Sequence, residues 1–262
     1  MPELPEVQTI VNGLNQKIPG KEIREIIELR PGTVIRRIQD QDLGIIVRIS
    51  RRGKYIILQT SNQIKIVIHL RMTGKLIFEP VAEKLSKYAR AEIVFTDQTR
   101  LIFNDIRTFG KIIIAKEEDG IFPELGAEPL SDSFNTEYLK EKLSKRKAPV
   151  KNLLLDQQII AGLGNIYASE ILFRCRIDPR KAGNKLKMAQ IRSIVEQTKT
   201  VLREAIEHNG TTISDYRSVE DKTGEFQNFL NVYGQKNCPC GAGISRIKQA
   251  GRSTFFCARC QK

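Results

Sequence analysis

Residues 23–115 carry eight short runs rich in β-branched residues, and turn residues rather than helical patterns separate them. The runs cover residues 23–29, 44–50, 54–60, 64–70, 75–78, 91–95, 100–103 and 111–115. Parallel neighbours in a sheet need long crossover connections, usually helices, and this region offers none. The pattern therefore predicts antiparallel strands that form a β-sandwich or flattened barrel.

A helix is predicted ahead of these strands, beginning at Pro5, because proline fits the first turn of a helix. The apolar residues that follow at helical spacing are Val7, Ile10, Val11, Leu14 and Ile18. A Pro-Gly pair at residues 19–20 is expected to end the helix. Pro2 and Glu3 would then lie just before the helix, outside its buried face, with Glu6 in its first turn.

The first residues also form a candidate reactive group. Removal of Met1 would leave Pro2 with a free secondary amine, which attacks a sugar aldehyde carbon to give an iminium ion directly. An α-amino group has a pKa of ~8, below that of lysine, so more of it is neutral at pH 7. Glu3 and Glu6 supply carboxylates for proton transfer. A frayed terminus with a helix-starting proline is the alternative, and these residues alone leave both open.

The net charge of +13 indicates a polyanionic partner, most commonly nucleic acid. An anionic membrane surface is the competing partner, but no basic amphipathic helix with large exposed apolar residues is evident. The lack of Trp and the 6% aromatic content favour duplex DNA over a stacking platform for single strands. No segment approaches the ~18 apolar residues of a membrane span, and the N-terminus is unlike a signal peptide, so a cytosolic protein is expected.

Three loops between the predicted strands, at residues 51–54, 69–74 and 104–110, carry cationic side chains. Two of them also carry an apolar residue close to an arginine, Met72 in one and Phe109 in the other. For each loop alone, a solvated turn or a core residue is the commoner explanation. Together they offer cations for phosphates and apolar wedges that could fill the space left by an extruded base.

The chain changes character after residue 115. Residues 116–133 are rich in Gly, Pro and acidic residues and are expected to form a linker. Helical periodicity then predicts helices over 137–145, 150–158, 165–176 and 187–208. A glycine turn at 162–164 precedes the third helix, which Asn165 is placed to cap. This is a common DNA-docking unit, with an ordinary helical hairpin as the alternative.

The last 25 residues contain four of the five cysteines. They are Cys238, Cys240, Cys257 and Cys260, two close pairs on either side of a basic segment. Such spacing predicts one tetrahedral zinc site joined to a hairpin, and four protein ligands leave no open position, so the zinc would be structural. Four spare thiols in a reducing cytosol are the alternative. Cys175 stands alone in an apolar stretch and is expected in the core.

Three separated segments carry a resemblance to a known family. They are Met-Pro-Glu-Leu-Pro-Glu at 1–6, Gly-Leu-Gly-Asn-Ile-Tyr-Ala-Ser-Glu at 162–170, and Ala-Gly-Arg-Ser-Thr-Phe-Phe-Cys at 250–257. The whole chain resembles the formamidopyrimidine-DNA glycosylases, bifunctional enzymes that excise oxidised purines. The resemblance implies an α+β multidomain protein with an antiparallel β-sandwich and flanking helix at 1–115, a linker at 116–133, a helix–two-turn–helix domain at 134–226 and a zinc finger at 227–262.

The resemblance also implies roles for single residues. Pro2 looks like the nucleophile that forms a Schiff base, Glu3 like the general acid and base, and Glu6 like a second, positioning carboxylate. Lys54 resembles the lysine that contacts phosphate near the lesion and is grouped with the catalytic set. The other DNA-binding candidates are His69, Lys151, Asn165 and Arg252 at the backbone, and Met72, Arg107 and Phe109 as the residues that fill the void. A loop containing Asp215, Tyr216 and Arg217 resembles the one that closes over the lesion. A monomer acting on duplex DNA with oxidised bases or abasic sites is expected.

Two departures from the family pattern stand out. The first cysteine pair is C-x-C where the family has C-x₂-C, which puts in doubt which first cysteine binds zinc. Thr108 stands where a second basic residue is common. Two rival functions remain: an endonuclease VIII-type glycosylase for oxidised pyrimidines, and a non-catalytic DNA-binding protein on the same fold. Leu4 and the three void-filling residues favour the purine enzyme over the first rival, and intact Pro2 and Glu3 speak against the second.

Overall fold

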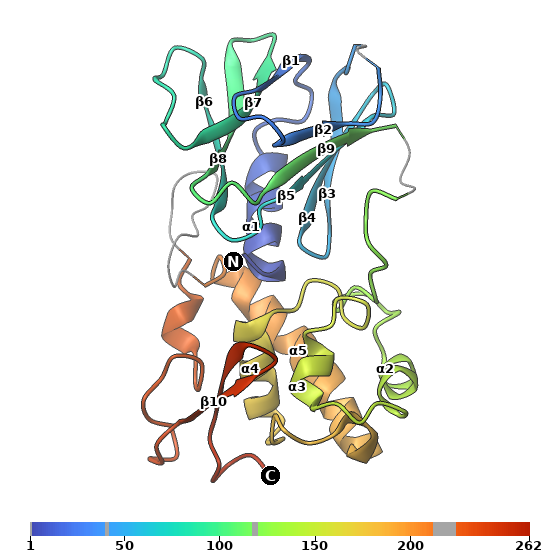
Figure 1. Cartoon of the computed structure of the whole chain (residues 1–262), viewed down its shortest axis with the longest axis vertical. Helices are drawn as coiled ribbons and strands as arrows, with labels where there is room; N and C mark the ends of the chain where they lie inside the picture. Colours follow the sequence, from blue (N-terminus) through green and yellow to red (C-terminus); the bar gives the residue numbers. More distant parts are fainter. Residues whose placement is uncertain (1, 40–41, 117–119, 212–223) are drawn as a thin grey trace. The chain divides into compact units, whose positions relative to one another are not determined.

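The computed structural model describes residues 2–39, 42–116, 120–211 and 224–262. The chain forms two compact units. The first combines Met1–Pro123 with His208–Glu225, and the second combines Glu124–Glu207 with Phe226–Lys262 (Figure 1). A short return segment therefore belongs to the unit built from the start of the chain. The residue limits of the four segments predicted above stay a prediction.

The first unit contains a helix and two sheets. The helix is α1 (Leu4–Asn15), and the strands are β1 (Ile23–Glu28), β2 (Val34–Arg36), β3 (Ile46–Arg52), β4 (Tyr55–Thr60), β5 (Lys65–His69), β6 (Gly74–Pro80), β7 (Ala89–Phe95), β8 (Thr99–Asp105) and β9 (Lys111–Ala115). One sheet has the strand order β1-β7-β8-β6 and the other β2-β9-β5-β4-β3. The predicted sandwich with a flanking helix is confirmed.

A single apolar core joins α1 to both sheets. The buried face of α1 includes Val7, Ile10, Val11 and Leu14, as the helical spacing predicts, and the helix packs on β3 and β4. From the sheets come residues such as Ile56, Ile68 and Phe103, which are also buried. The position of α1 is thus set by apolar burial, the dominant favourable term in folding.

The structure differs from the strand prediction in one element. All eight predicted runs are strands, but the three-residue strand β2 (Val34–Arg36) was not predicted, because three residues are too few to show alternation. It pairs parallel with β9, whereas every other described strand pair is antiparallel.

The second unit is helical and ends in a hairpin. Its elements are α2 (Thr136–Leu143), α3 (Val150–Leu154), α4 (Asn165–Arg174), the 3₁₀ turn η1 (Gly183–Lys185), α5 (Met188–Glu207), the 3₁₀ turn η2 (Phe226–Phe229), β10 (Ser245–Gln249) and β11 (Arg252–Phe256). Helix α5 packs on α2 and α4, and α4 also packs on α3 and β11. The hairpin turn consists of Ala250 and Gly251, both with positive φ, which is the requirement of a tight two-residue turn.

Two details of the helical prediction are wrong. Helix α3 ends at Leu154 rather than at residue 158, because the Asp156 carboxylate accepts the backbone N–H of Gln158 over 3.0 Å and turns the chain locally. Asn165 does not cap α4: the cap position is held by Gly164, and Asn165 is the first helical residue. Among the described residues, no helix is long and apolar enough to cross a membrane.

Candidate active site and nucleic-acid interface

The first residues of the chain are held by a reciprocal hydrogen-bonded cap at the start of α1. The Glu3 carboxylate accepts the backbone N–H of Glu6, and the Glu3 backbone N–H donates to Glu6 Oε2 over 2.7 Å. Both side chains are buried, at 3% and 2% exposure, and Pro2 is buried as well. The expectation that Pro2 and Glu3 lie outside the buried face is therefore wrong, since the cap draws them inward. An anionic side chain here also interacts favourably with the positive end of the helix.

Glu6 has a second task, which connects the start of the chain to the return segment. Its other oxygen, Oε1, accepts the backbone N–H of Thr211 over 2.8 Å. Gly210, the residue before Thr211, has a φ of +78°. A Cβ at this position would lie 2.8 Å from Glu6 Oε1. Gly224 packs against the carbonyl of Gly210 in turn, where a Cβ would meet the oxygen at 2.2 Å. The sequence predicted a lesion-covering loop in this region but not the contact with Glu6, because a contact 205 residues away leaves no local pattern.

The basic turn between β3 and β4 is joined to the same helix. Arg51 Nε donates to Gln8 Oε1 over 3.0 Å, and Arg51 Nη1 donates to the Gly53 carbonyl over 2.9 Å. Lys54 follows in this turn and is 7% exposed. The hydrogen bond from Arg51 to Gln8 thus fixes the turn that carries Lys54 against α1.

His69 lies at the end of β5, where its ring packs edge-on against Tyr55 with the centroids 4.5 Å apart. Burial, together with the positive charges of Arg71 and Lys54, lowers the pKa of His69 to about 4. Its Nδ1 accepts the backbone N–H of Arg71 over 3.0 Å. At neutral pH the ring is therefore uncharged with its proton on Nε2, which can donate to a phosphate oxygen without a positive charge.

The loops after β5 and β8 carry exposed apolar side chains, among them Met72 and Phe109. Met72 is 42% exposed and Phe109 is 51% exposed. The Arg107 guanidinium lies 5.2 Å from the centre of the Phe109 ring. The backbone N–H of Arg107 donates to the Thr73 hydroxyl over 3.1 Å, so the two loops are in direct contact. The structure thus brings together the two loops that carry Met72, Arg107 and Phe109.

Lys151 and Asn165 form a buried pair in the second unit. Lys151 is 0% exposed, and its Nζ donates to Asn165 Oδ1 over 2.7 Å, to the Ser253 carbonyl over 3.0 Å and to the Thr254 hydroxyl over 2.8 Å. An ammonium group has three donors, and these contacts use all three. Direct DNA binding, predicted for Lys151, does not fit this burial; the side chain instead positions Asn165. The Asn165 Nδ2 also donates to the Ser253 carbonyl, over 2.9 Å.

A buried carboxylate holds the chain that leads into the hairpin. Glu170 on α4 is 1% exposed and accepts the backbone N–H groups of Asn231, Val232 and Tyr233 over 2.9, 2.9 and 2.8 Å. Glu170 ends the 162–170 motif, and the motif alone predicted no role for it. A carboxylate that accepts several backbone N–H groups satisfies its own charge and fixes the backbone that donates to it.

The four clustered cysteines form a metal site. Their sulfur atoms all lie within 4.8 Å of one another, with Cys238 Sγ 3.8 Å from Cys260 Sγ and Cys240 Sγ 3.7 Å from Cys257 Sγ. A tetrahedral zinc with Zn–S bonds of about 2.3 Å needs sulfur separations of about 3.8 Å, so the cluster fits one structural zinc, as predicted. The short C-x-C pair reaches the site because the chain turns at Gly241, whose φ is +84° and whose N–H donates to the Cys238 carbonyl over 2.8 Å.

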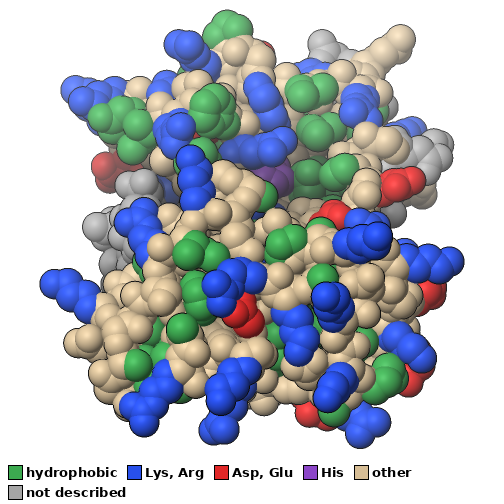
Figure 2. Space-filling model, turned by 60° about the horizontal axis from the view of Figure 1, so that its bottom comes forward, with side chains coloured by type: hydrophobic (Ala, Val, Ile, Leu, Met, Phe, Trp, Pro, Cys, Tyr) green, Lys and Arg blue, Asp and Glu red, His purple; other side chains and the backbone are tan. Residues whose placement is uncertain are grey.

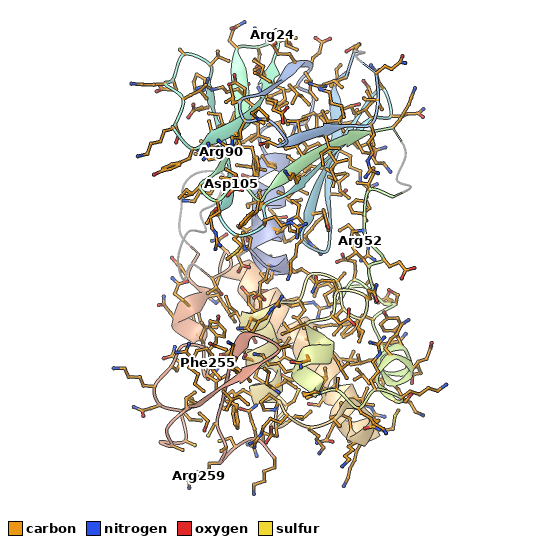
Figure 3. The ribbon with its side chains drawn as sticks, viewed as in Figure 1. Arg24, Arg52, Arg90, Asp105, Phe255 and Arg259 are labelled. Atoms are coloured by element: carbon orange, nitrogen blue, oxygen red, sulfur yellow. The ribbon has the colours of Figure 1, made fainter. Side chains whose placement is uncertain are left out.

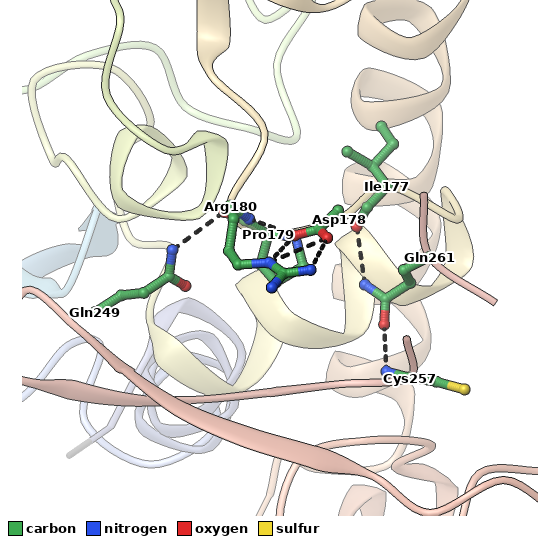
Figure 4. A network of polar contacts seen from close by, with 7 residues as sticks. All are labelled: Ile177, Asp178, Pro179, Arg180, Gln249, Cys257 and Gln261. Carbon is green, nitrogen blue, oxygen red and sulfur yellow. Dashed lines mark hydrogen bonds and ion pairs between the residues drawn. The ribbon is translucent and has the colours of Figure 1, made fainter. Parts of the chain in front are cut away.

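Polar contacts attach this zinc site to the loop after α4 (Figure 4). The Gln261 side chain accepts the N–H of Cys257 and donates to the Ile177 carbonyl, each over 2.9 Å. Gln249 Nε2 donates to the Pro179 carbonyl over 3.4 Å. Arg252, at the start of β11, remains exposed at the hairpin turn. These contacts fix the position of the hairpin, so the exposed Arg252 is carried by an ordered segment.

The excess of cationic side chains is visible on the surface. Figure 2 shows a face on which Lys and Arg side chains are far more common than Asp and Glu. This agrees with the net charge of +13. Four residues named in the sequence analysis, Met1, Asp215, Tyr216 and Arg217, lie outside the described residues.

Comparison with known proteins decides the family. Residues 1–112 match the formamidopyrimidine-DNA glycosylase N-terminal domain, residues 125–217 the H2TH domain of the same enzymes, and residues 239–262 a zinc finger found in FPG and IleRS. The chain is 42% identical over 271 aligned residues to the formamidopyrimidine-DNA glycosylase of a Wolbachia strain from Drosophila simulans, covering 100% of both chains. The chain belongs to the formamidopyrimidine-DNA glycosylase family. The prediction of a DNA glycosylase of base excision repair is confirmed by this membership.

Solved structures of formamidopyrimidine-DNA glycosylases share the fold over the full length. The Thermus thermophilus protein, MutM (Fpg), is 36% identical with a TM-score of 0.91, covering 99% of this chain and 98% of that one. A mutant of the Lactococcus lactis enzyme in complex with Fapy-dG containing DNA is 34% identical with a TM-score of 0.91, covering 100% of both chains. Other complexes of the Lactococcus lactis enzyme hold DNA with an abasic site or with an oxidised pyrimidine.

Proposed function

We propose that this chain is a bifunctional DNA glycosylase and abasic-site lyase that removes oxidised purines through a Schiff base at Pro2. The observation that carries the proposal is the buried cap at the start of α1, which holds Glu3 beside Pro2 through paired contacts with Glu6. This cap keeps two carboxylates next to the terminal residue, where they can exchange protons with a reacting sugar. The family membership supports the same chemistry.

The proposed reaction begins after removal of Met1. The Pro2 nitrogen attacks C1′ of the damaged nucleotide, the bond from C1′ to the base breaks, and the base leaves with the amine proton. Glu3 then protonates O4′, the C1′–O4′ bond breaks, and the nitrogen becomes an iminium ion. The iminium acidifies the 2′ hydrogens, so that elimination cleaves the strand on the 3′ side and then on the 5′ side. Glu3 moves protons in sugar-ring opening and in these eliminations. Glu6 keeps Glu3 in place, because its carboxylate accepts the Glu3 N–H.

Duplex DNA is the proposed partner, and each unit contributes to its binding. In the first unit, Lys54 and the neutral His69 contact backbone phosphate, while Met72, Arg107 and Phe109 occupy the space left by the extruded nucleotide. In the second unit, Asn165 and Arg252 contact phosphate. The complexes of the Lactococcus lactis enzyme with lesion-containing DNA support this assignment. We further propose that the protein works as a monomer in the bacterial cytosol, in keeping with its bacterial relatives.

Oxidised pyrimidines are a second candidate substrate class, favoured by one observation. A wild-type Lactococcus lactis enzyme with 34% identity has been solved with DNA containing an oxidised pyrimidine. Single-turnover excision of 8-oxoguanine opposite cytosine, compared with thymine glycol in the same sequence, separates the two classes. Faster excision of 8-oxoguanine supports the purine assignment, and the reverse ranking overturns it.

Borohydride trapping tests the Schiff base. Wild-type protein on an 8-oxoguanine duplex is expected to form a covalent adduct after reduction, and intact mass should show loss of Met1. Pro2→Gly should diminish the adduct, and Glu3→Gln should diminish adduct formation on the base-containing duplex. The absence of any adduct with wild-type protein, or an undiminished adduct with either variant, would contradict the role of the corresponding residue.

A further inference from the structure

Asp105 ends β8 directly before the loop that carries Arg107 and Phe109, and its side chain is 1% exposed. The Arg90 guanidinium lies beside it, and Arg90 Nε donates to the Asp105 carbonyl over 2.7 Å (Figure 3). The reaction proposed above gives Asp105 no role. A buried carboxylate is costly unless its oxygens accept hydrogen bonds, so the partners of this one indicate what it supports.

The partners of the Asp105 carboxylate come from two loops. Oδ2 accepts the backbone N–H of Gly110 over 2.8 Å, and Oδ1 accepts that of Arg107 over 3.2 Å. Oδ1 also accepts the hydroxyl hydrogen of Thr73, the residue after Met72. Because the Arg107 N–H reaches the Thr73 hydroxyl as well, the carboxylate, the hydroxyl and this N–H form a closed set of contacts. One carboxylate thus joins the loop with Met72 to the loop with Phe109.

The backbone of both loops needs such support. Arg71 and Thr108 have φ of +54° and +59°, a region unfavourable for residues with a Cβ. A conformation of this kind persists only where surrounding contacts over-determine it. Both loops also pack tightly on the Phe103 ring: a Cβ at Gly74 would lie 2.9 Å from a ring atom, and one at Gly110 would lie 2.3 Å away.

We propose that Asp105 is a positioning residue for base extrusion, which holds Met72, Arg107 and Phe109 as one preformed insertion element. The inference rests on the proposed function, in which these side chains enter the DNA stack. An insertion element that is already ordered in the free protein loses less conformational entropy when it enters DNA, so extrusion is faster. Asp105 does not touch DNA in this scheme and acts through the two loops.

Asp105→Asn is the direct test, because it keeps the shape but replaces one accepting oxygen with a donor that faces N–H groups. Extrusion is followed by stopped-flow fluorescence of 2-aminopurine next to 8-oxoguanine in a duplex. We expect extrusion and single-turnover excision to slow about tenfold, the equivalent of one lost hydrogen bond to a charged group. The matched control is Asp97→Asn, at the other end of the same β7–β8 hairpin, where Asp97 accepts from Thr99. The control should extrude the base at the wild-type rate.

A double-mutant cycle with Phe109→Ala separates positioning from general stability. If Asp105 acts through the insertion element, Asp105→Asn should slow extrusion little further once Phe109 is removed. The inference would be overturned if the double variant lost extrusion rate by the product of the two single-variant factors. A wild-type extrusion rate for Asp105→Asn alone would also overturn it. Should Asp105→Asn lower the melting temperature markedly, Thr73→Val is used in the same cycle. Unchanged extrusion in Phe109→Ala itself would instead defeat the insertion role in the proposed function.

Discussion

Lys151 Nζ lies 2.7 Å from Asn165 Oδ1, and this contact fixes the orientation of the Asn165 amide, which is proposed to contact the DNA backbone. The same ammonium holds two residues of β11, Ser253 and Thr254. The helix pair and the zinc hairpin therefore share one buried cation. Arg252, one residue before Ser253, is exposed and differs from Lys151 in what it can offer to DNA.

The salt dependence of DNA binding should distinguish Lys151 from Arg252. Each phosphate contact contributes about 0.9 to the slope of log affinity against log salt concentration. Arg252→Ala should lower this slope by about 1 with an unchanged melting temperature, because it removes an exposed phosphate contact. Lys151→Met should lower both affinity and melting temperature while the slope stays constant. An equal loss of slope in both variants would show that Lys151 does contact phosphate.

Gly210→Ala should weaken the link between the return segment and Glu6. The new Cβ would lie 2.8 Å from Glu6 Oε1, so the Thr211 contact must shift, and we expect a loss of about 1–3 kcal/mol in stability. Schiff-base formation, measured by borohydride trapping on an abasic duplex, should slow as well. Gly20→Ala is the matched control, since Gly20 has a similar φ of +83° but nothing within 4 Å of a Cβ. Equal trapping rates for the two variants would contradict a link to the reactive group.

The stability of the first unit should depend on pH through His69. The pKa of His69 is about 4 in the folded protein because of burial and nearby cations, against 6.5 in the unfolded chain. The unfolded state then binds more protons between these values, so this contribution is fully present above pH 6.5 and is lost as the pH falls towards 4. Urea unfolding at several pH values checks this, with His69→Gln removing the dependence. An imidazole NMR titration with a midpoint near 6.5 would contradict it.

Zinc stoichiometry should separate the clustered cysteines from Cys175. Cys240→Ser should lower bound zinc well below one per chain and weaken DNA binding, because the hairpin that carries Arg252 loses a ligand. Cys175→Ser should keep one zinc per chain. Burial raises the pKa of the Cys175 thiol to about 11, so it should react slowly with iodoacetamide at pH 8. Full zinc content in Cys240→Ser would overturn the assignment of that ligand.

The parts of the fold that follow from local pattern could be predicted from the sequence. The β-branched runs in β4, β5, β7 and β8 indicate buried strands, and the helical spacing of Val7, Ile10 and Leu14 indicates one buried helix face. Both patterns are properties of neighbouring residues. The cysteine pairs predicted a zinc site for a similar reason, since ligand spacing is local. The three-residue strand β2 is too short for such a pattern.

The contacts that hold the site could not be predicted in the same way. Burial of Lys151 depends on residues 102 and 103 positions away, and the Glu6 contact with Thr211 spans 205 positions. Its positive charge made Lys151 a DNA-binding candidate. The same ammonium donors can instead bond to buried oxygen atoms, as they do here with Asn165, Ser253 and Thr254. The role of Asp105 is of this kind too, because its partners lie on two loops that only the sheet brings together.

The hydrogen bond between Glu6 and Thr211 has a consequence for folding during synthesis on the ribosome. Synthesis proceeds from the N-terminus, so Pro2 and Glu3 leave the ribosome long before the segment that completes their support. All strands of the two sheets lie within the first 123 residues. The contact between Glu6 and Thr211 can form only after the helices of the second unit have been synthesised. A nascent chain therefore carries the cap at Glu3 and Glu6 without its contact to Thr211 until helices α2 to α5 have been synthesised.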